Sequence, residues 1–106
     1  ILFLAVMYVR GDGLQKSNKL ALYWFLKAAK HGHPLSQFTL GKMYFKGVGV
    51  RRNYKKSFKW LEKAAKQGHI KARNNIALMY YKGTGVKRDI SKAFKWSLQA
   101  SDHDKM

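Results

Sequence analysis

The side chains that could carry out chemistry are few and lie far apart in this sequence. There is no cysteine, which excludes a thiol nucleophile, thiolate metal ligands and disulfide bonds. The acidic residues Asp12, Glu62 and Asp89 are too scattered to form the paired carboxylates of an acid–base site. His31 and His33 form a His-x-His pair, but no acidic or sulfur-containing residue lies near them in sequence to complete a metal site. We therefore expect no enzyme, no metal or cofactor, and no small-molecule substrate.

Three Gly-x-Gly segments invite comparison with phosphate-binding loops. They begin at Gly11, Gly47 and Gly83 and end at Gly13, Gly49 and Gly85. A phosphate-binding loop follows a strand and runs directly into a helix, whereas each of these segments follows a helical pattern. The glycines are better explained as turns, in which Gly11, Gly47 and Gly83 form left-handed caps on the preceding helices.

A spacing of 36 residues orders most of the chain. It relates three tryptophans, three tyrosines and three glycines: Trp24, Trp60 and Trp96; Tyr8, Tyr44 and Tyr80; Gly11, Gly47 and Gly83. A fixed period of this length indicates a repeat array, in which each unit packs on its neighbours. We interpret the chain as three units, 1–33, 34–69 and 70–106, that together form one all-α domain.

Each unit is expected to consist of a helix A, a glycine-containing loop and a helix B. Apolar residues recur with helical spacing over 1–9, 35–45 and 71–81 for helix A, and over 18–30, 54–66 and 90–101 for helix B. The residues before the B helices are good N-caps: Ser17, Asn53 and Asp89. Pro34 suits the first position of a helix, and His33 and His69 are expected to cap the A helices. The polar residues 102–106 are expected to fray.

The periodic tryptophans and methionines have two alternative roles. Tryptophans are frequent anchors of binding interfaces, and flexible methionines, here Met7, Met43 and Met79, suit a binding groove. Both sets share the phase of the apolar helix faces, however, which favours packing. A small residue recurs on helix A as Ala5, Gly41 and Ala77, and is expected to let helix B approach closely.

Unit two carries a pattern that resembles a known family. It runs Leu40-Gly41-Lys-Met43-Tyr44-Phe-Lys-Gly47-Val-Gly49-Val50 and continues with Trp60, Ala64-Ala65 and Gly68. Unit three repeats the pattern, but Ser101 and Asp104 replace the second alanine and the closing glycine. This unit resembles the Sel1-like repeat, a longer relative of the tetratricopeptide repeat. The resemblance implies a right-handed α/α solenoid and a bacterial adaptor or scaffold for protein–protein interaction, with no conserved catalytic group.

The chain is strongly basic, with 22 lysines and arginines against five acidic residues and a net charge of +17. Such a charge favours an anionic partner, which is either an acidic protein, a nucleic acid or an anionic membrane surface. Basic residues also follow the period near the loops, which predicts a ladder of positive charge: Arg10, Lys16, Arg52 and Arg88. The alternative is a merely solvated lysine-rich surface. The absence of a nucleic-acid reader motif, together with aromatic residues at core phases, favours a protein partner.

Helix-A positions that differ between units are expected to face the concave groove in which solenoids usually bind. The predicted groove residues are Thr39, Lys42, Lys46, Asn75, Leu78 and Lys82. The apolar residues Ile1, Leu2 and Phe3 at the other end predict self-association through that end. No apolar run reaches the length of about 18 residues that a membrane-spanning helix requires, so we expect a soluble protein in an unassigned compartment.

Overall fold

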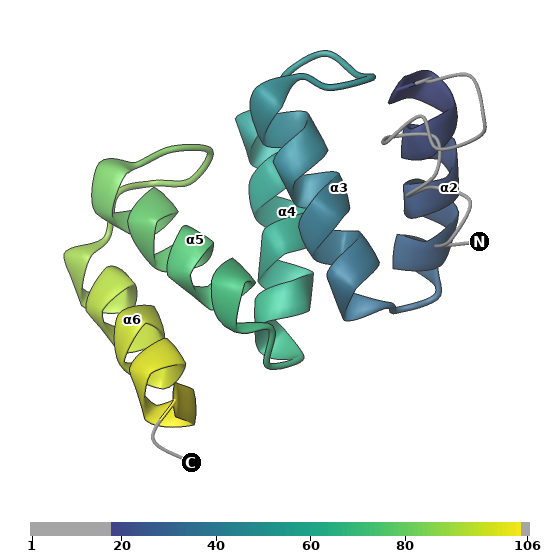
Figure 1. Cartoon of the computed structure of the whole chain (residues 1–106). Helices are drawn as coiled ribbons and strands as arrows, with labels where there is room; N and C mark the ends of the chain where they lie inside the picture. Colours follow the sequence, from purple (N-terminus) through teal and green to yellow (C-terminus); the bar gives the residue numbers. More distant parts are fainter. Residues whose placement is uncertain (1–17, 105–106) are drawn as a thin grey trace.

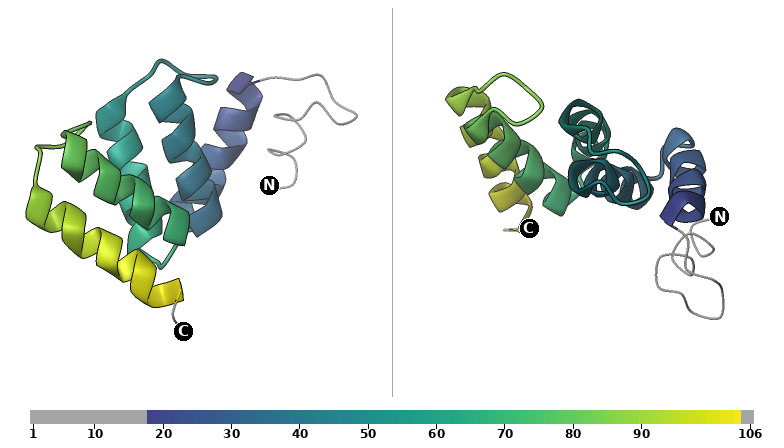
Figure 2. Two further views of the ribbon diagram at one scale, coloured as in Figure 1. Left: turned by 60° about the vertical axis from the view of Figure 1, so that its left-hand side comes forward. Right: turned by 90° about the horizontal axis from the view of Figure 1, so that it is seen from above.

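The computed structural model describes residues 18–104, and within this range all regular structure is helical (Figure 1). The helices are α2 (Asn18–Lys30), α3 (Pro34–Lys46), α4 (Tyr54–Lys66), α5 (Ile70–Lys82) and α6 (Ile90–Asp104). Consecutive helices pack against each other, and seen from above α2 and the pairs α3–α4 and α5–α6 form a row (Figure 2). This part of the chain is an all-α solenoid, as the repeat predicts. The helix predicted at 1–9 and the apolar residues 1–3 lie outside the described residues, so self-association through them stays a prediction.

The helix ends follow from capping residues that recur with the repeat. The Oδ1 atoms of Asn53 and Asp89 each accept a hydrogen bond of 3.0 Å from a backbone N–H in the first turn of α4 and α6. The Nδ1 atoms of His33 and His69 accept from backbone N–H groups of α3 and α5, both at 3.2 Å. Pro34 opens α3, where its missing N–H has no helical partner to lose. These caps were predicted and are confirmed, whereas Ser17 lies outside the described residues.

Helix α6 is longer than the sequence pattern predicts. It continues to Asp104, although a helix ending at 101 and a frayed tail from 102 were expected. After α2 and α4, Gly32 and Gly68 adopt positive φ angles of 86° and 93° and help turn the chain into the next helix. The corresponding position after α6 holds Asp104. Because no glycine turns the chain there, the predicted helix end was wrong, and the prediction of fraying was wrong for 102–104.

Helices α3 and α4 approach closely at a glycine. A Cβ atom added at Gly41 would lie 2.6 Å from Cγ of Leu61, so any larger residue would force the two helices apart. The buried hydroxyl of Ser57 donates a hydrogen bond of 2.7 Å to the carbonyl of Gly41. The small residue expected at this position therefore serves both packing and a buried hydrogen bond.

The periodic aromatic residues and methionines form the core. Trp60 is 9% exposed and packs with Ala29, Leu40 and Tyr44, which belong to α2 and α3. Trp24 and Trp96 are partly buried against two further apolar clusters. Met43, Met79 and Tyr80 are also buried. Packing is therefore confirmed for the three tryptophans and for Met43 and Met79, whereas Met7 and Tyr8 lie outside the described residues.

Two side chains at one repeat position connect successive B helices. Nε2 of Gln37 donates a hydrogen bond of 3.1 Å to the carbonyl of Ala29 in α2, and its Oε1 accepts one of 2.8 Å from Gln67 after α4. One unit later, Nε of Arg73 donates to the carbonyl of Ala65 in α4 at 3.1 Å. Its Nη1 donates to the carbonyl of Gln99 in α6 at 3.3 Å. This polar bridge between neighbouring units was not predicted, because glutamine and arginine do not form a visible repeat.

The second glycine of the Gly-x-Gly segment in unit three is required by stacking between units. Gly85 has a φ of 72°, and a Cβ atom added there would lie 2.7 Å from the carbonyl carbon of Tyr54, at the start of α4. The loop of unit three thus packs on the backbone of unit two. The glycine serves this close approach as well as the turn that the sequence predicts.

The two requirements at Gly85 can be separated by comparison with Gly32, which has a positive φ but no atom within 4 Å of an added Cβ. Gly32→Ala is expected to lower the free energy of unfolding by about 1–2 kcal/mol, the usual cost of left-handed backbone. Gly85→Ala is expected to cost about 1–3 kcal/mol more, because backbone atoms must move. Urea denaturation of both variants measures the difference, and equal losses would contradict the stacking argument.

The cap on α5 makes stability depend on pH. Burial, assisted by the nearby charge of Lys71, lowers the pKa of His69 below its usual value of 6.5. The neutral ring accepts from the Ala72 N–H, and a protonated ring cannot. This contribution to stability is therefore complete above about pH 6.5 and is lost as the pH falls through the lower pKa of the folded protein.

The variant His69→Asn keeps an N-cap acceptor but does not titrate. Its midpoint of thermal unfolding is expected to change less between pH 7 and pH 5 than that of the wild type. His31→Asn, which alters an exposed histidine that caps no helix, serves as the control and is expected to retain the wild-type dependence. An unchanged pH dependence in His69→Asn would refute the role of the cap.

Candidate functional site

A hollow of about 250 Å³ lies between α3 and α5, and we call it the α3/α5 groove. Nine residues from three helices and one loop line it: Lys42, Phe45, Lys46, Leu61, Asn75, Leu78, Met79, Lys82 and Thr84. The contributing helices belong to units two and three, so the groove exists only because the two units stack.

The structure brings five of the six predicted groove residues together around this hollow: Lys42, Lys46, Asn75, Leu78 and Lys82. The sixth, Thr39, does not line it, and its hydroxyl donates a hydrogen bond of 2.9 Å to the carbonyl of Leu35 within the same helix. Whether these residues bind a partner stays a prediction. Of the remaining lining residues, Met79 was considered for a groove from the sequence but was assigned to packing, and the structure gives it both positions. Phe45, Leu61 and Thr84 were not predicted, and Leu61 shares the phase of the core.

The floor and the walls of the groove are apolar. Leu61 and Met79, which are 1% and 3% exposed, form part of the core and also border the hollow. Leu78 and Phe45 are 52% and 38% exposed at its sides. The Phe45 ring packs against Tyr54, with 5.0 Å between the ring centroids, which holds this wall in place. The groove therefore offers apolar surface that no described residue fills.

Three lysines lie among this apolar surface without a carboxylate among the lining residues: Lys42, Lys46 and Lys82. Lys46 and Lys82 are the last residues of α3 and α5, so they occupy the same place in successive units. In the described part of the chain the one ion pair is Lys66–Glu62, at 3.9 Å on α4. The charge of the groove is therefore not neutralised from within the described residues.

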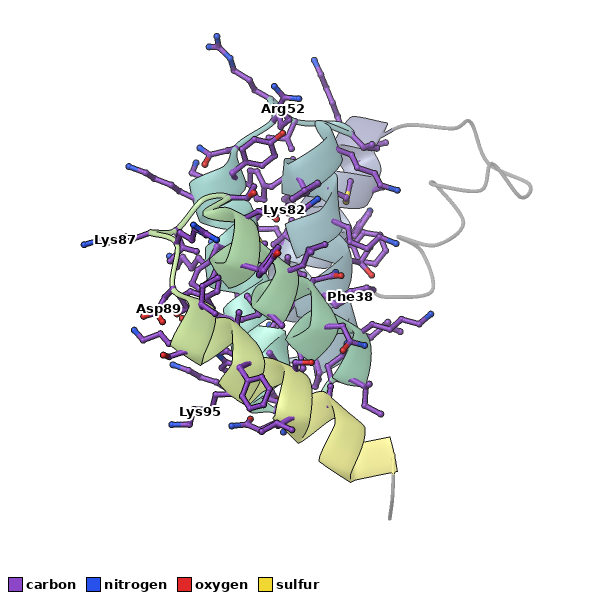
Figure 3. All side chains as sticks on the ribbon, turned by 90° about the vertical axis from the view of Figure 1, so that its left-hand side faces the viewer. Phe38, Arg52, Lys82, Lys87, Asp89 and Lys95 are labelled. Atoms are coloured by element: carbon purple, nitrogen blue, oxygen red, sulfur yellow. The ribbon has the colours of Figure 1, made fainter. Side chains whose placement is uncertain are left out.

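The predicted charge ladder is only partly described, because Arg10 and Lys16 lie outside the described residues. Arg52 is at the loop end of the molecule (Figure 3), with its guanidinium 5.1 Å from the ring of Tyr54. Arg88 donates a hydrogen bond of 3.0 Å from Nε to the carbonyl of Tyr81, and its guanidinium lies 5.9 Å from that ring. Both arginines thus have structural contacts around the loops that follow α3 and α5.

Many lysines of the B helices lie over aromatic rings instead of pairing with carboxylates. The ammonium groups of Lys56 and Lys92 are each 5.6 Å from the ring of a core tyrosine, Tyr44 and Tyr80. These two contacts are equivalent in successive units. Lys63 lies 5.1 Å from the ring of Trp60 in the same manner. Such cation–π contacts stabilise a lysine-rich surface, so these charges have a role within the fold.

The described part of the chain holds no constellation suited to catalysis. Burial lowers the pKa of His69, and burial together with the carboxylates of Glu62 and Asp89 raises the pKa of Tyr80. One of these groups caps a helix and the other packs in the core. Residues 18–104 contain no group of three or more potential metal ligands. Helices α2 to α6 are all too short or too polar to cross a bilayer.

Helix pairs stacked in a row, with a groove between successive A helices, define an α-solenoid repeat protein. Sequence comparison matches the Sel1 repeat to residues 1–33, 34–69 and 70–105, and the chain belongs to the Sel1 repeat family. Proteins of this family are generally scaffolds for protein–protein interaction and typically lack catalytic activity. No curated protein sequence matches the chain.

Two solved structures of this family are similar to the whole chain. A Sel1 repeat protein from Oxalobacter formigenes is 35% identical with a TM-score of 0.93, over 95% of this chain and 42% of that protein. A protective antigen of uropathogenic Escherichia coli strains, which displays an SLR fold, is 34% identical with a TM-score of 0.93. That match covers 96% of this chain and 22% of the antigen. The chain thus spans less than half the length of either protein.

Substitutions in the exposed wall and in the buried floor of the groove should differ in their effect on the free energy of unfolding. Leu78→Ala is expected to change the free energy of unfolding by less than about 0.5 kcal/mol, as at other surface positions. The adjacent substitution Met79→Ala is expected to cost about 2–5 kcal/mol, because it opens a cavity in the core. Chemical denaturation of the two variants provides the measurement, and a large loss in Leu78→Ala would show that this side chain supports the fold and is not available for binding.

Proposed function

We propose that this chain is a non-catalytic adaptor that binds an acidic segment of a partner protein in the α3/α5 groove. One observation carries the proposal: three lysines and no carboxylate line a hollow that also exposes apolar surface. Unfilled apolar surface favours a partner that buries it. The three lysines have no carboxylate partner among the described residues, which favours carboxylates on that partner. The role agrees with the general function of Sel1 repeat proteins.

The net charge and the groove act at different stages of binding. A charge of +17 attracts an acidic protein over a distance and raises the association rate. Specific binding then depends on the local fit of apolar and charged groups. Lysines that lie over aromatic rings on the B helices contribute to the first stage, whereas Lys46 and Lys82 contribute to both.

The alternative partner is a nucleic acid or an anionic membrane surface. The sequence argument against it placed the aromatic residues in the core, but Tyr81 is 55% exposed beside Arg88. An exposed aromatic ring next to a guanidinium resembles the surfaces that bind single-stranded nucleic acid. Tyr23 and Phe94 are exposed as well, at 48% and 65%, but they lie on α2 and α6, away from Tyr81 in sequence. The groove gathers nine residues around one hollow, so we favour the protein partner.

A charge-reversal experiment tests the groove. The probe is a fluorescent peptide with a leucine between runs of glutamate, and its anisotropy reports binding at physiological salt. Lys46→Glu and Lys82→Glu are each expected to weaken binding about five- to tenfold, because an attractive charge becomes repulsive. The matched control is Lys30→Glu, which alters the last residue of α2 and the net charge equally but lies outside the groove. It is expected to change affinity less than about twofold.

Equal losses in all three variants would mean that net charge alone governs binding, and the groove assignment would be abandoned. A single-stranded oligonucleotide serves as the competing ligand. Tighter binding of the oligonucleotide than of the peptide, with a log–log salt slope of about −0.7 per phosphate contacted, would favour the alternative partner.

A further inference from the structure

Asn75 contributes a polar side chain to the lining of the α3/α5 groove. This side chain is half-buried and makes no hydrogen bond to any described residue. Thr39, one unit earlier at the same repeat position, donates its hydroxyl to Leu35 and lies outside the groove. At this repeat position, unit three therefore places a carboxamide without a hydrogen-bond partner in the groove, whereas the threonine of unit two lies outside the groove.

A carboxamide carries a donor and an acceptor, which together match the N–H and C=O groups of a peptide backbone. In a helix, the main-chain groups away from the ends already bond to each other. In an extended segment, they are free to pair with a protein side chain. A partner that uses the Asn75 carboxamide through its main chain is therefore extended and not helical.

The size of the hollow limits what can enter it. At about 250 Å³ it is smaller than the pockets of roughly 300–1,000 Å³ that enclose small-molecule ligands. Leu61 and Met79 form its floor, and Phe45 and Leu78 its walls. A space of this size and polarity fits one apolar side chain of a bound peptide, and Lys42, Lys46 and Lys82 then meet the residues next to that side chain.

We propose that the α3/α5 groove binds an extended acidic peptide through one apolar anchor residue, with the peptide backbone held by Asn75. The proposal rests on the proposed function and adds to it the conformation of the ligand and the residue that reads its main chain. In an extended chain, alternate side chains point to the same side. The anchor therefore enters the hollow while the flanking carboxylates meet the lysines.

The probes are three modified forms of the glutamate–leucine peptide. One replaces the leucine by glycine, and one is N-methylated at the residues around the leucine. The third carries α-methylglutamate in place of glutamates, which favours a helix and keeps every carboxylate. Loss of the leucine is expected to weaken binding by about tenfold or more. N-methylation is expected to weaken binding to the wild type about fivefold, and to have little effect on Asn75→Ala, in which the carboxamide is already absent.

Two further variants serve as controls. Thr39→Ala changes the equivalent position outside the groove and is expected to leave affinity unchanged. Asn75→Ser provides a second substitution in case the alanine variant is unstable. The serine variant is expected to bind more weakly than the wild type, because a hydroxyl is too short to replace both carboxamide contacts. Circular dichroism establishes that each variant is folded.

The outcomes separate this inference from the proposed function. If the helix-favouring peptide binds more tightly, or if N-methylation weakens the wild type and Asn75→Ala equally, the extended mode is overturned while binding in the groove stands. If no acidic peptide binds, or if Lys46→Glu and Lys82→Glu bind as the wild type does, both proposals fail. Loss of affinity on N-methylation that disappears in Asn75→Ala supports the inference.

Discussion

The stacking of one helix pair on the next is the constraint on which the rest of this structure depends. Trp60 of unit two packs with Ala29 of unit one, and Leu61, the adjacent residue, packs with α5 of unit three. Neither unit could bury these side chains alone. Gly41 allows α4 to approach α3 closely, and this same approach places Leu61 under the groove. Core and candidate site therefore share residues, and the shape of the groove is set by the packing of the helices.

The high positive charge is distributed in two different ways over the described part of the chain. On the B helices, lysines such as Lys56 and Lys92 lie over aromatic rings of the core. At the groove, Lys46 and Lys82 have no such ring contact and no carboxylate among the lining residues. The third lysine of the groove, Lys42, lies 5.3 Å from the ring of Phe38. Lys46 and Lys82 are therefore the groove lysines without an aromatic or carboxylate partner among the described residues, and they are the ones that the proposed acidic partner would neutralise.

The sequence predicted what depends on residue type at fixed spacing. The bounds of α2 and α4, the caps at Asn53 and His69, and five residues around the groove follow from the 36-residue period. Features that depend on how elements meet in space were not predictable. The bridge is made by unlike residues, Gln37 and Arg73, and the hollow is bordered by three helices that belong to two units. The repeat position of Thr39 suggests a role in binding, but its hydroxyl already donates a hydrogen bond to the carbonyl of Leu35 in the same helix.

The bridge at Gln37 and Arg73 has a consequence for the mechanics of the array. Each side chain lies in the first turns of an A helix and hydrogen-bonds to a carbonyl near the end of the preceding B helix. It also hydrogen-bonds to a residue in or directly after the following B helix. The groove lies between α3 and α5, so its width changes when the two units rotate relative to each other. The hydrogen bonds of Gln37 and Arg73 restrict this rotation at one edge of the contact between units. A ligand of the kind proposed for the groove would restrict the rotation at a second place, and its binding would then stiffen the solenoid against bending.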